Sequence, residues 1–165
     1  MRKIFLIGCA ALSLILVTCQ QFSSQNGARP ATHEDYKGYK MAPYTVGGNR
    51  FVPMSVEQAL RYDVVGKASW YEADGAQGAI CQKLYAGELY AAHRTLPLPC
   101  EVKITSMTTG KSCIVRVADR GPYIHGRLID VSTAVARVLG FEHAGLDTVR
   151  VQVLSVGDGA YKRTR

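Results

Sequence analysis

The sequence predicts a mainly β-structured domain that closes into a small barrel and carries one or two short helices. Three observations support this fold class. Short segments between residues 66 and 154 alternate polar and apolar side chains, as half-buried strands do. Turn signals that contain glycine separate these segments. Helical end signals are few, and many short strands with little helix are typical of a barrel.

The first predicted strand and a central hairpin can be located along the chain. Residues 66–71 alternate enough for a strand, and residues 101–107 do so regularly. Thr109-Gly110 is a turn signal, and residues 113–118 form the expected return strand. The two segments around the turn therefore predict a β-hairpin.

The C-terminal part of the domain predicts two further strands around the helix. Residues 128–131 read as a short strand. A helix over 133–139 follows, with Ser132 as its polar N-cap and Gly140 after its last turn. Residues 149–154 alternate again and form the last expected strand.

The N-terminus predicts export. Met1-Arg2-Lys3 is basic, and residues 4–17 are almost wholly apolar or small, which is the length of a signal-peptide core. A transmembrane anchor is the alternative, but a spanning helix needs roughly 20 apolar residues.

This segment ends in Leu16-Val17-Thr18-Cys19, which resembles a bacterial lipoprotein signal, although Thr18 departs from the usual small residue. We expect residues 1–18 to be the signal peptide and Cys19 to carry the lipid, with export without lipid as the alternative. The chain would then be a membrane-anchored lipoprotein facing the periplasm. Gln20 lacks the acidic side chain associated with inner-membrane retention, which favours the outer membrane.

The remaining boundaries follow from composition. Residues 19–65 are expected to be a tether that ends in an extended and short-helical segment. Its tyrosines, Tyr36, Tyr39 and Tyr44, would lie across the domain surface. Ser55 and Gln58 have the spacing of a capping box, so a helix over 56–62 is expected. The barrel would span 66–154, and residues 155–165 would form a flexible tail.

The charge pattern argues against nucleic acid as a partner. The formal net charge is +7, but lysine and arginine are scattered and form no run. No zinc-finger spacing and no aromatic-rich RNA-binding signature are present. No spacing of His93 with Cys81 or Cys100 matches a zinc site either, so neither a metal nor a cofactor is expected.

Four stretches in register resemble one known family. They read G-K-A-S-W-Y at 66–71, Y-A-A-H-R-T-L-P-L-P at 90–99, V-R-V-A-D-R-G-P-Y at 115–123 and G-R-L-I-D-V-S-T-A-V-A-R-V-L-G-F at 126–141. In this order they are similar to the rare-lipoprotein-A (RlpA) family, over about half of the chain. The resemblance implies a six-stranded double-psi β-barrel. It also implies a lytic transglycosylase that cuts peptidoglycan between MurNAc and GlcNAc, through attack by the C6 hydroxyl of MurNAc.

The resemblance places two catalytic candidates. One carboxyl group can protonate the leaving oxygen and then deprotonate the attacking hydroxyl. Asp119 matches the aspartate of the family's D-R-G-P motif, and capping of the following turn is its alternative role. His93 matches the family's histidine and would orient Asp119 or share a proton with it, unless it is a satisfied core histidine.

One departure from the family bears on catalysis. The family's T-A-[NS]-G-E stretch ends in a glutamate, and an ungapped match places Gln82 there. A glutamine binds sugar hydroxyls through its amide but transfers no carboxylic proton. Glu88 is the nearest substitute, and Glu72 and Asp74 are more distant ones.

The other expected glycan contacts are aromatic or basic. Trp70 and Tyr71 would stack on sugar faces, although one of the two should pack in the core because neighbouring strand residues point to opposite faces. Tyr123 is a third aromatic candidate. Arg120 would bind the carboxylate of muramic acid or form an internal salt bridge.

The cysteines permit three pairings among Cys81, Cys100 and Cys113. The hairpin register disfavours a bond from Cys100 to Cys113, so we expect a Cys81–Cys100 disulfide, with three free thiols as the alternative.

Two rival functions remain open besides the transglycosylase. A non-catalytic, expansin-like glycan-binding barrel follows from the position of Gln82. A hydrolase would need a second carboxylate near Asp119, for which Glu88, Glu72 and Asp130 are the candidates. The residues do not indicate a protein partner.

Overall fold

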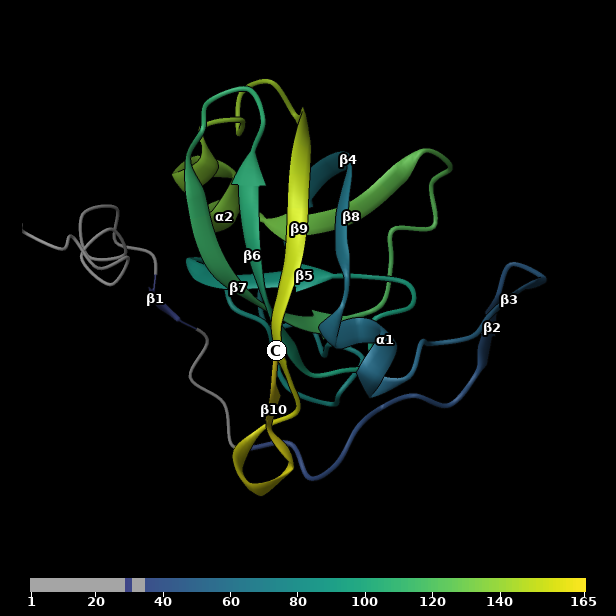
Figure 1. Cartoon of the computed structure of the whole chain (residues 1–165). Coiled ribbons are helices and arrows are strands. Elements are labelled where there is room, and N and C mark those ends of the chain that lie inside the picture. The colour runs from purple at the N-terminus through teal and green to yellow at the C-terminus, as the bar shows by residue number, and fades with distance from the viewer. Residues whose placement is uncertain (1–28, 31–34) are drawn as a thin grey trace, which may run out of the picture.

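The computed structural model describes residues 29–30 and 35–165, and its centre is a closed six-stranded barrel (Figure 1). The strands are β4 (Asp63–Tyr71), β5 (Glu88–Ala92), β6 (Cys100–Ser106), β7 (Ser112–Asp119), β8 (Arg127–Ser132) and β9 (Leu146–Val156). They pair in the order β5-β7-β6-β9-β4-β8, and an additional β5–β8 pairing closes the ring. The prediction of a six-stranded barrel is therefore confirmed.

Two of the barrel pairings are parallel and the others are antiparallel. Strand β4 runs parallel to β8, and β5 runs parallel to β7. Both parallel pairs contain a register shift, between Lys67 and Ala68 in the first and between Ala91 and Ala92 in the second. Such irregularities bend a strand and redirect its side chains, and the second lies beside the end of β7.

The barrel interior is filled by alternate residues of the strands. In β6 the burial pattern alternates strictly along Cys100–Ser106, and β9 alternates over most of its length. Strand β5 is different because four of its five residues are buried, so it shows no alternation. That continuous apolar run explains why the sequence did not predict β5.

The helices have the predicted end signals. Helix α1 (Val56–Leu60) begins with a complete capping box between Ser55 and Gln58. Helix α2 (Thr133–Leu139) is capped by Ser132 and ends at Gly140, whose φ of 87° is left-handed. A left-handed C-terminal residue favours glycine because it lacks a Cβ. None of the helices within the described ranges is long and apolar enough to cross a membrane.

The segment before α1 wraps around the barrel. Strands β2 (Tyr44–Val46) and β3 (Asn49–Phe51) form a hairpin that stands out from the barrel in Figure 1. The backbone of Lys40 pairs with Leu98, and Tyr36 and Tyr39 contact the C-terminal segment through Asp158 and Tyr161. Strand β1 (Arg29–Pro30) pairs with β5.

The C-terminal residues are folded rather than frayed. A 3-10 helix, η2 (Gly159–Tyr161), leads into β10 (Arg163–Thr164), which pairs with β9. The barrel's first strand also begins at Asp63, three residues before the expected boundary. The signal peptide and Cys19 lie outside the described residues.

Candidate active site

Three strand ends meet around the carboxylate of Asp119. Asp119 is the last residue of β7, Tyr71 the last of β4 and Ala92 the last of β5. Asp119 Oδ1 accepts hydrogen bonds from the amides of Ala79, at 3.0 Å, and Arg120, at 2.8 Å. Its Oδ2 accepts one from the Tyr71 hydroxyl at 3.2 Å. Oδ2 therefore keeps a lone pair for a proton, while the two amides occupy Oδ1.

A second carboxylate, that of Asp130, lies on the other side of β5. Ala92 pairs with Asp119 in β7 and with Asp130 in β8. Because adjacent strands lie about 4.8 Å apart, the Cα atoms of the two aspartates are roughly 10 Å apart. Asp130 accepts a hydrogen bond from Ser69 Oγ, and Arg127 lies 3.9 Å away. Of the carboxylates considered from the sequence, Asp130 has the position best suited to act with Asp119.

Tyr71 binds Asp119 and is influenced by the charge of Asp130, whereas Trp70 points elsewhere. Burial raises the pKa of Tyr71, and the negative charges of Asp119 and Asp130 raise it further. Its hydroxyl therefore stays protonated and acts as a donor. The Tyr71 ring packs edge-on against Tyr90, with centroids 5.5 Å apart. Trp70 is on the opposite face, 37% exposed, and donates to the Glu142 carbonyl.

His93 is a satisfied buried histidine rather than a direct partner of the Asp119 carboxylate. Its Nδ1 accepts from the amides of Thr95 and Leu96, so Nε2 carries the proton and donates to the Tyr62 hydroxyl at 3.0 Å. Burial lowers the pKa of His93 to about 3, and the charges of Arg94 and Arg120 add to this effect. Its link to Asp119 is through the backbone, where its amide donates to the Asp119 carbonyl at 3.0 Å.

Arg120 also differs from its expected role. Its guanidinium donates to four backbone carbonyls, at 2.5 Å to Leu96, 2.8 Å to Lys40, 3.2 Å to His93 and 3.3 Å to Arg94. The internal salt bridge that was the alternative role of Arg120 is not formed with any described residue, because its guanidinium pairs with carbonyls. These contacts use both terminal nitrogens of the guanidinium, so Arg120 holds the histidine loop and the N-terminal segment together next to Asp119.

The loop before β5 joins Gln82 to the site. The Gly78 amide donates to the Gln82 carbonyl, and the next amide, that of Ala79, binds Asp119. The Gln82 side chain accepts from Arg116, which also forms a 2.5 Å ion pair with Asp158. Cys81 has a φ of 63°, and the family pattern places glycine at that position. This left-handed conformation is consistent with the ungapped match that puts Gln82 at the family's glutamate.

The remaining acidic candidates differ from Asp130 in strand position or in exposure. Glu88 begins β5, about 13 Å along the strand from Ala92. Its carboxylate accepts from the Tyr85 amide. Glu72 and Asp74 are exposed in the loop after β4. The structure thus favours Asp130 over all three as the second carboxylate.

The expected Cys81–Cys100 disulfide is not formed. Cys81, Cys100 and Cys113 are free thiols. Cys100 is buried at the start of β6, whereas Cys81 is exposed in the loop. Among residues 29–30 and 35–165, no group of histidine, cysteine and acidic side chains is arranged to hold a metal.

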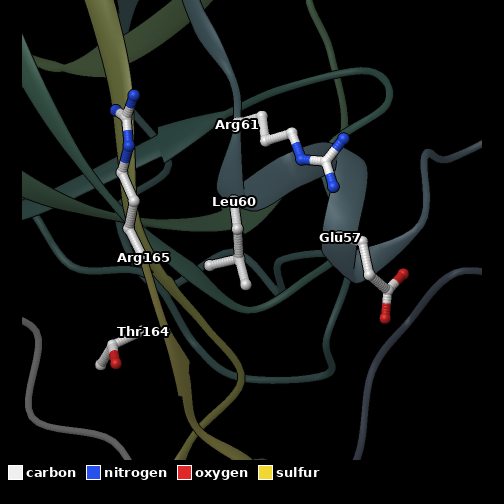
Figure 2. A pocket seen from close by; sticks show the side chains of 5 residues that line it. All are labelled: Glu57, Leu60, Arg61, Thr164 and Arg165. Carbon is white, nitrogen blue, oxygen red and sulfur yellow. The ribbon is translucent and has the colours of Figure 1, made fainter.

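One surface hollow lies apart from these residues. Figure 2 shows it between α1 and the C-terminal strand. It is lined by Glu57, Leu60, Arg61, Thr164 and Arg165. None of these residues contacts Asp119, Tyr71 or Asp130 through a hydrogen bond or ion pair described above.

The N-terminal segment takes part in the site, which the sequence did not predict. The Lys40 ammonium donates to the carbonyl of Ala79, the residue whose amide binds Asp119. The Tyr44 hydroxyl donates to the Arg94 carbonyl at 2.9 Å. The tyrosines of this segment were expected to lie across the surface, but no local pattern indicated which part of the barrel they would reach.

A family model described as lytic transglycolase matches residues 63–153, which are the barrel and its helix α2. The chain belongs to this family. The match includes Asp119, Tyr71, Asp130, His93 and Gln82, and it ends before the C-terminal strand.

Several proteins named endolytic peptidoglycan transglycosylase RlpA are similar to this chain. The relative from Pseudomonas aeruginosa strain UCBPP-PA14 is 44% identical over 119 residues, which cover 68% of this chain and 33% of the relative. The relative from Rickettsia typhi is 32% identical over 167 residues, which cover 89% of this chain and 52% of the relative. The chain therefore spans a third to a half of the length of these two relatives. Among solved structures, the apo expansin of Clavibacter michiganensis matches with a TM-score of 0.49 and 19% identity, covering 59% of this chain and 53% of that one.

Proposed function

We propose that this chain is an endolytic peptidoglycan transglycosylase that cleaves glycan strands between MurNAc and GlcNAc. The relatives that carry this name, and the family match over the barrel, support the reaction class. The observation that carries the proposal is the Asp119 carboxylate, which three donors hold in one orientation at a point where three strands end.

In this reaction the Asp119 carboxyl acts first as an acid and then as a base. It donates its proton to the glycosidic oxygen while the bond from that oxygen to the anomeric carbon of MurNAc breaks. The MurNAc C6 hydroxyl then attacks the anomeric carbon and returns its proton to Asp119. No water is consumed, and the product ends in 1,6-anhydro-MurNAc. The single carboxyl group is regenerated because it recovers the proton that it gave up.

Tyr71, Asp130 and His93 serve this carboxyl in different ways. The Tyr71 hydroxyl orients Asp119 Oδ2. Asp130 faces the reacting sugar from the opposite side of Ala92, where its negative charge stabilises the positive charge that develops on the sugar ring. His93 is a positioning residue, because it holds the loop of Thr95 and Leu96 and its amide binds the Asp119 carbonyl.

The second candidate function is a non-catalytic glycan-binding barrel. Gln82 favours it, since an amide stands at the family's glutamate position and the Arg116 guanidinium binds its oxygen. An amide in this network supports binding of sugar hydroxyls but no carboxylic proton transfer.

For the location of the chain, we propose export and lipid attachment at Cys19, with the barrel facing the periplasm from the outer membrane. The basic N-terminal residues, the apolar core of residues 4–17 and the Leu16–Cys19 motif support this. Fractionation of cells that express the chain or its Cys19→Ser variant tests it, because the variant should leave the membrane fraction.

The activity is tested with the purified full chain in detergent on peptidoglycan sacculi, with and without removal of the stem peptides. Mass spectrometry of the soluble products distinguishes anhydro ends from reducing ends. We expect anhydro ends that fall at least about 100-fold in Asp119→Asn. The matched control is Asp63→Asn, because Asp63 binds Arg150 at the far end of β4.

Each other outcome contradicts the proposal in a different way. Reducing ends would indicate a hydrolase, with Asp119 and Asp130 as its carboxylate pair. Glycan binding without products would indicate the non-catalytic barrel that Gln82 favours. Equal loss in Asp119→Asn and Asp63→Asn would show that the effect is general instability and not loss of a catalytic group.

A further inference from the structure

An aromatic ladder extends from the candidate active site along the N-terminal hairpin. The Arg120 guanidinium lies over the Tyr44 ring, 5.4 Å from its centroid. Tyr44 stacks on Phe51 with centroids 5.3 Å apart and an interplanar angle of 24°. Phe51 contacts Tyr123 at 5.5 Å and 53°. Arg120 directly follows Asp119, so this ladder begins beside the candidate catalytic carboxyl.

The hairpin that carries the ladder is held in place at both ends. The Lys40 carbonyl accepts a hydrogen bond from the Arg120 guanidinium, and the Tyr44 hydroxyl donates one to the Arg94 carbonyl. After the hairpin, the Met54 amide donates to the Thr95 carbonyl at 2.8 Å. Gly47 and Gly48 have φ values of 56° and 79°, as a two-residue hairpin turn requires. The aromatic rings are therefore positioned before any ligand arrives, which lowers the entropy cost of binding.

The outer end of the ladder remains open. Tyr123 is 45% exposed, and its neighbour Ile124 is 55% exposed. Burial raises the pKa of Tyr123, and its hydrogen bond with Tyr44 raises it further. The hydroxyl therefore stays neutral and can both donate and accept. Asn49 is exposed and lies two residues before Phe51 in the same strand, so it adds a polar group on the face that carries the aromatic rings. A rigid aromatic face with a polar edge matches the surface of a pyranose ring, which has apolar C–H faces and hydroxyls around its rim.

We infer that Tyr44, Phe51 and Tyr123 form a distal glycan subsite, which binds a sugar of the same strand whose bond is cut at Asp119. This inference rests on the proposed function, because that function supplies the glycan strand. The N-terminal hairpin, which lies outside the family match over residues 63–153, thereby becomes part of the substrate-binding surface. Longer strands reach both Asp119 and Tyr123, whereas short ones reach only the former.

The experiment measures the affinity of peptide-free glycan oligomers of two lengths for the full chain in detergent. An Asp119→Asn background prevents turnover. We expect the longer oligomer to bind more tightly than the shorter one. Tyr123→Ala should lower the affinity for the longer oligomer by about tenfold and should leave the affinity for the shorter one unchanged. Tyr123→Phe should still bind the longer oligomer more tightly than the shorter one, because it keeps the aromatic ring. Tyr85→Ala is the matched control, since Tyr85 is 46% exposed and lies outside the ladder.

Thermal unfolding of each variant shows whether the fold is retained. Phe51→Ala, which removes the support of Tyr123, should reduce the length dependence as well. Equal affinities of Tyr123→Ala and its parent for the longer oligomer would overturn the subsite. So would equal losses for both oligomer lengths, or a loss in Tyr123→Phe as large as in Tyr123→Ala.

Failure of the subsite and failure of the proposed function can be separated. If the unsubstituted chain releases no anhydro ends but Tyr123→Ala loses the length dependence, the catalytic proposal fails and the subsite stands. If the unsubstituted chain releases them and Tyr123→Ala binds both oligomers as its parent does, the subsite fails and the catalytic proposal stands.

Discussion

At the scale of single residues, the two oxygens of the Asp119 carboxyl group have different hydrogen-bond partners. Two backbone amides bind Oδ1, and one phenol binds Oδ2. The amides belong to the loop before β5 and to the turn after β7, so the orientation of the carboxyl depends on two separate parts of the chain. The phenol belongs to β4 and is the one of the three donors that a side-chain substitution can remove.

We expect Tyr71→Phe to lower kcat by about tenfold and to leave the affinity for glycan almost unchanged. The substitution removes one hydrogen bond to the Asp119 carboxylate, and a bond to a charged group is worth about 1.5 kcal/mol, which corresponds to about tenfold in rate. Steady-state kinetics on glycan strands, with binding measured in the Asp119→Asn background, give the two quantities separately.

The control for this substitution is Tyr90→Phe, because the Tyr90 hydroxyl accepts from the Ala73 amide and does not bind Asp119. If Tyr71→Phe weakens binding and leaves kcat unchanged, the phenol contacts the sugar, as the sequence predicts. In that case it does not orient the catalytic group.

At the scale of elements, the loop between β4 and β5 connects the site to the barrel core. Ile80 and Leu84 are 2% and 1% exposed, so the loop is anchored by burial. Its amide at Gly75 donates to the Leu84 carbonyl, and the Leu84 amide donates back to Ala76. Within this compact loop Cys81 is the one described residue other than glycine with a positive φ.

We expect Cys81→Gly to raise the free energy of unfolding by up to about 1 kcal/mol. A left-handed backbone costs roughly 1–2 kcal/mol for a residue with a Cβ, and glycine offsets part of this gain through its freer unfolded chain. Urea unfolding of the two proteins measures the difference. Ala86→Gly in the same loop is the control and should destabilise. A lower stability of Cys81→Gly would show that the thiol makes contacts worth more than the strain.

At the scale of the whole molecule, one buried histidine joins the candidate site to the stability of the fold. His93 is 3% exposed, and its ring binds Tyr62 and the loop that follows β5. Because burial lowers its pKa to about 3 from 6.5, the unfolded chain binds a proton at mildly acidic pH that the folded chain does not. The stability that depends on neutral His93 is therefore complete above pH 6.5 and is lost as the pH falls toward 3.

We expect the free energy of unfolding to fall by about 2 kcal/mol between pH 7.5 and pH 5 because of this group. Denaturant unfolding at several pH values measures the change. His93→Gln removes the titrating ring. The variant should therefore be less stable at pH 7.5, but its free energy of unfolding should fall much less on acidification. An equal loss in both proteins would assign the pH dependence to other groups.

The sequence by itself determined the local elements of this chain and its family. Alternation predicted β6 and β9, and the turn signal at Thr109-Gly110 predicted β7 as the return strand of a hairpin. The end signals at Ser132 and Gly140 placed α2 over the residues that it occupies. These features depend on neighbouring residues, since alternation and capping act within a few positions of the chain. The motif around Asp119 likewise named the central residue of the candidate site.

Only the tertiary structure decided which groups meet. Strand β5 pairs with both β7 and β8, so Ala92 comes to lie between Asp119 and Asp130, which no spacing in the sequence shows. The same closure turns the ring nitrogens of His93 toward Tyr62 and the loop amides, and it directs Arg120 to four carbonyls. Partners of this kind are far apart along the chain. Barrel closure and the wrapping of the N-terminal segment bring them together, because only the folded chain fixes contacts between distant residues.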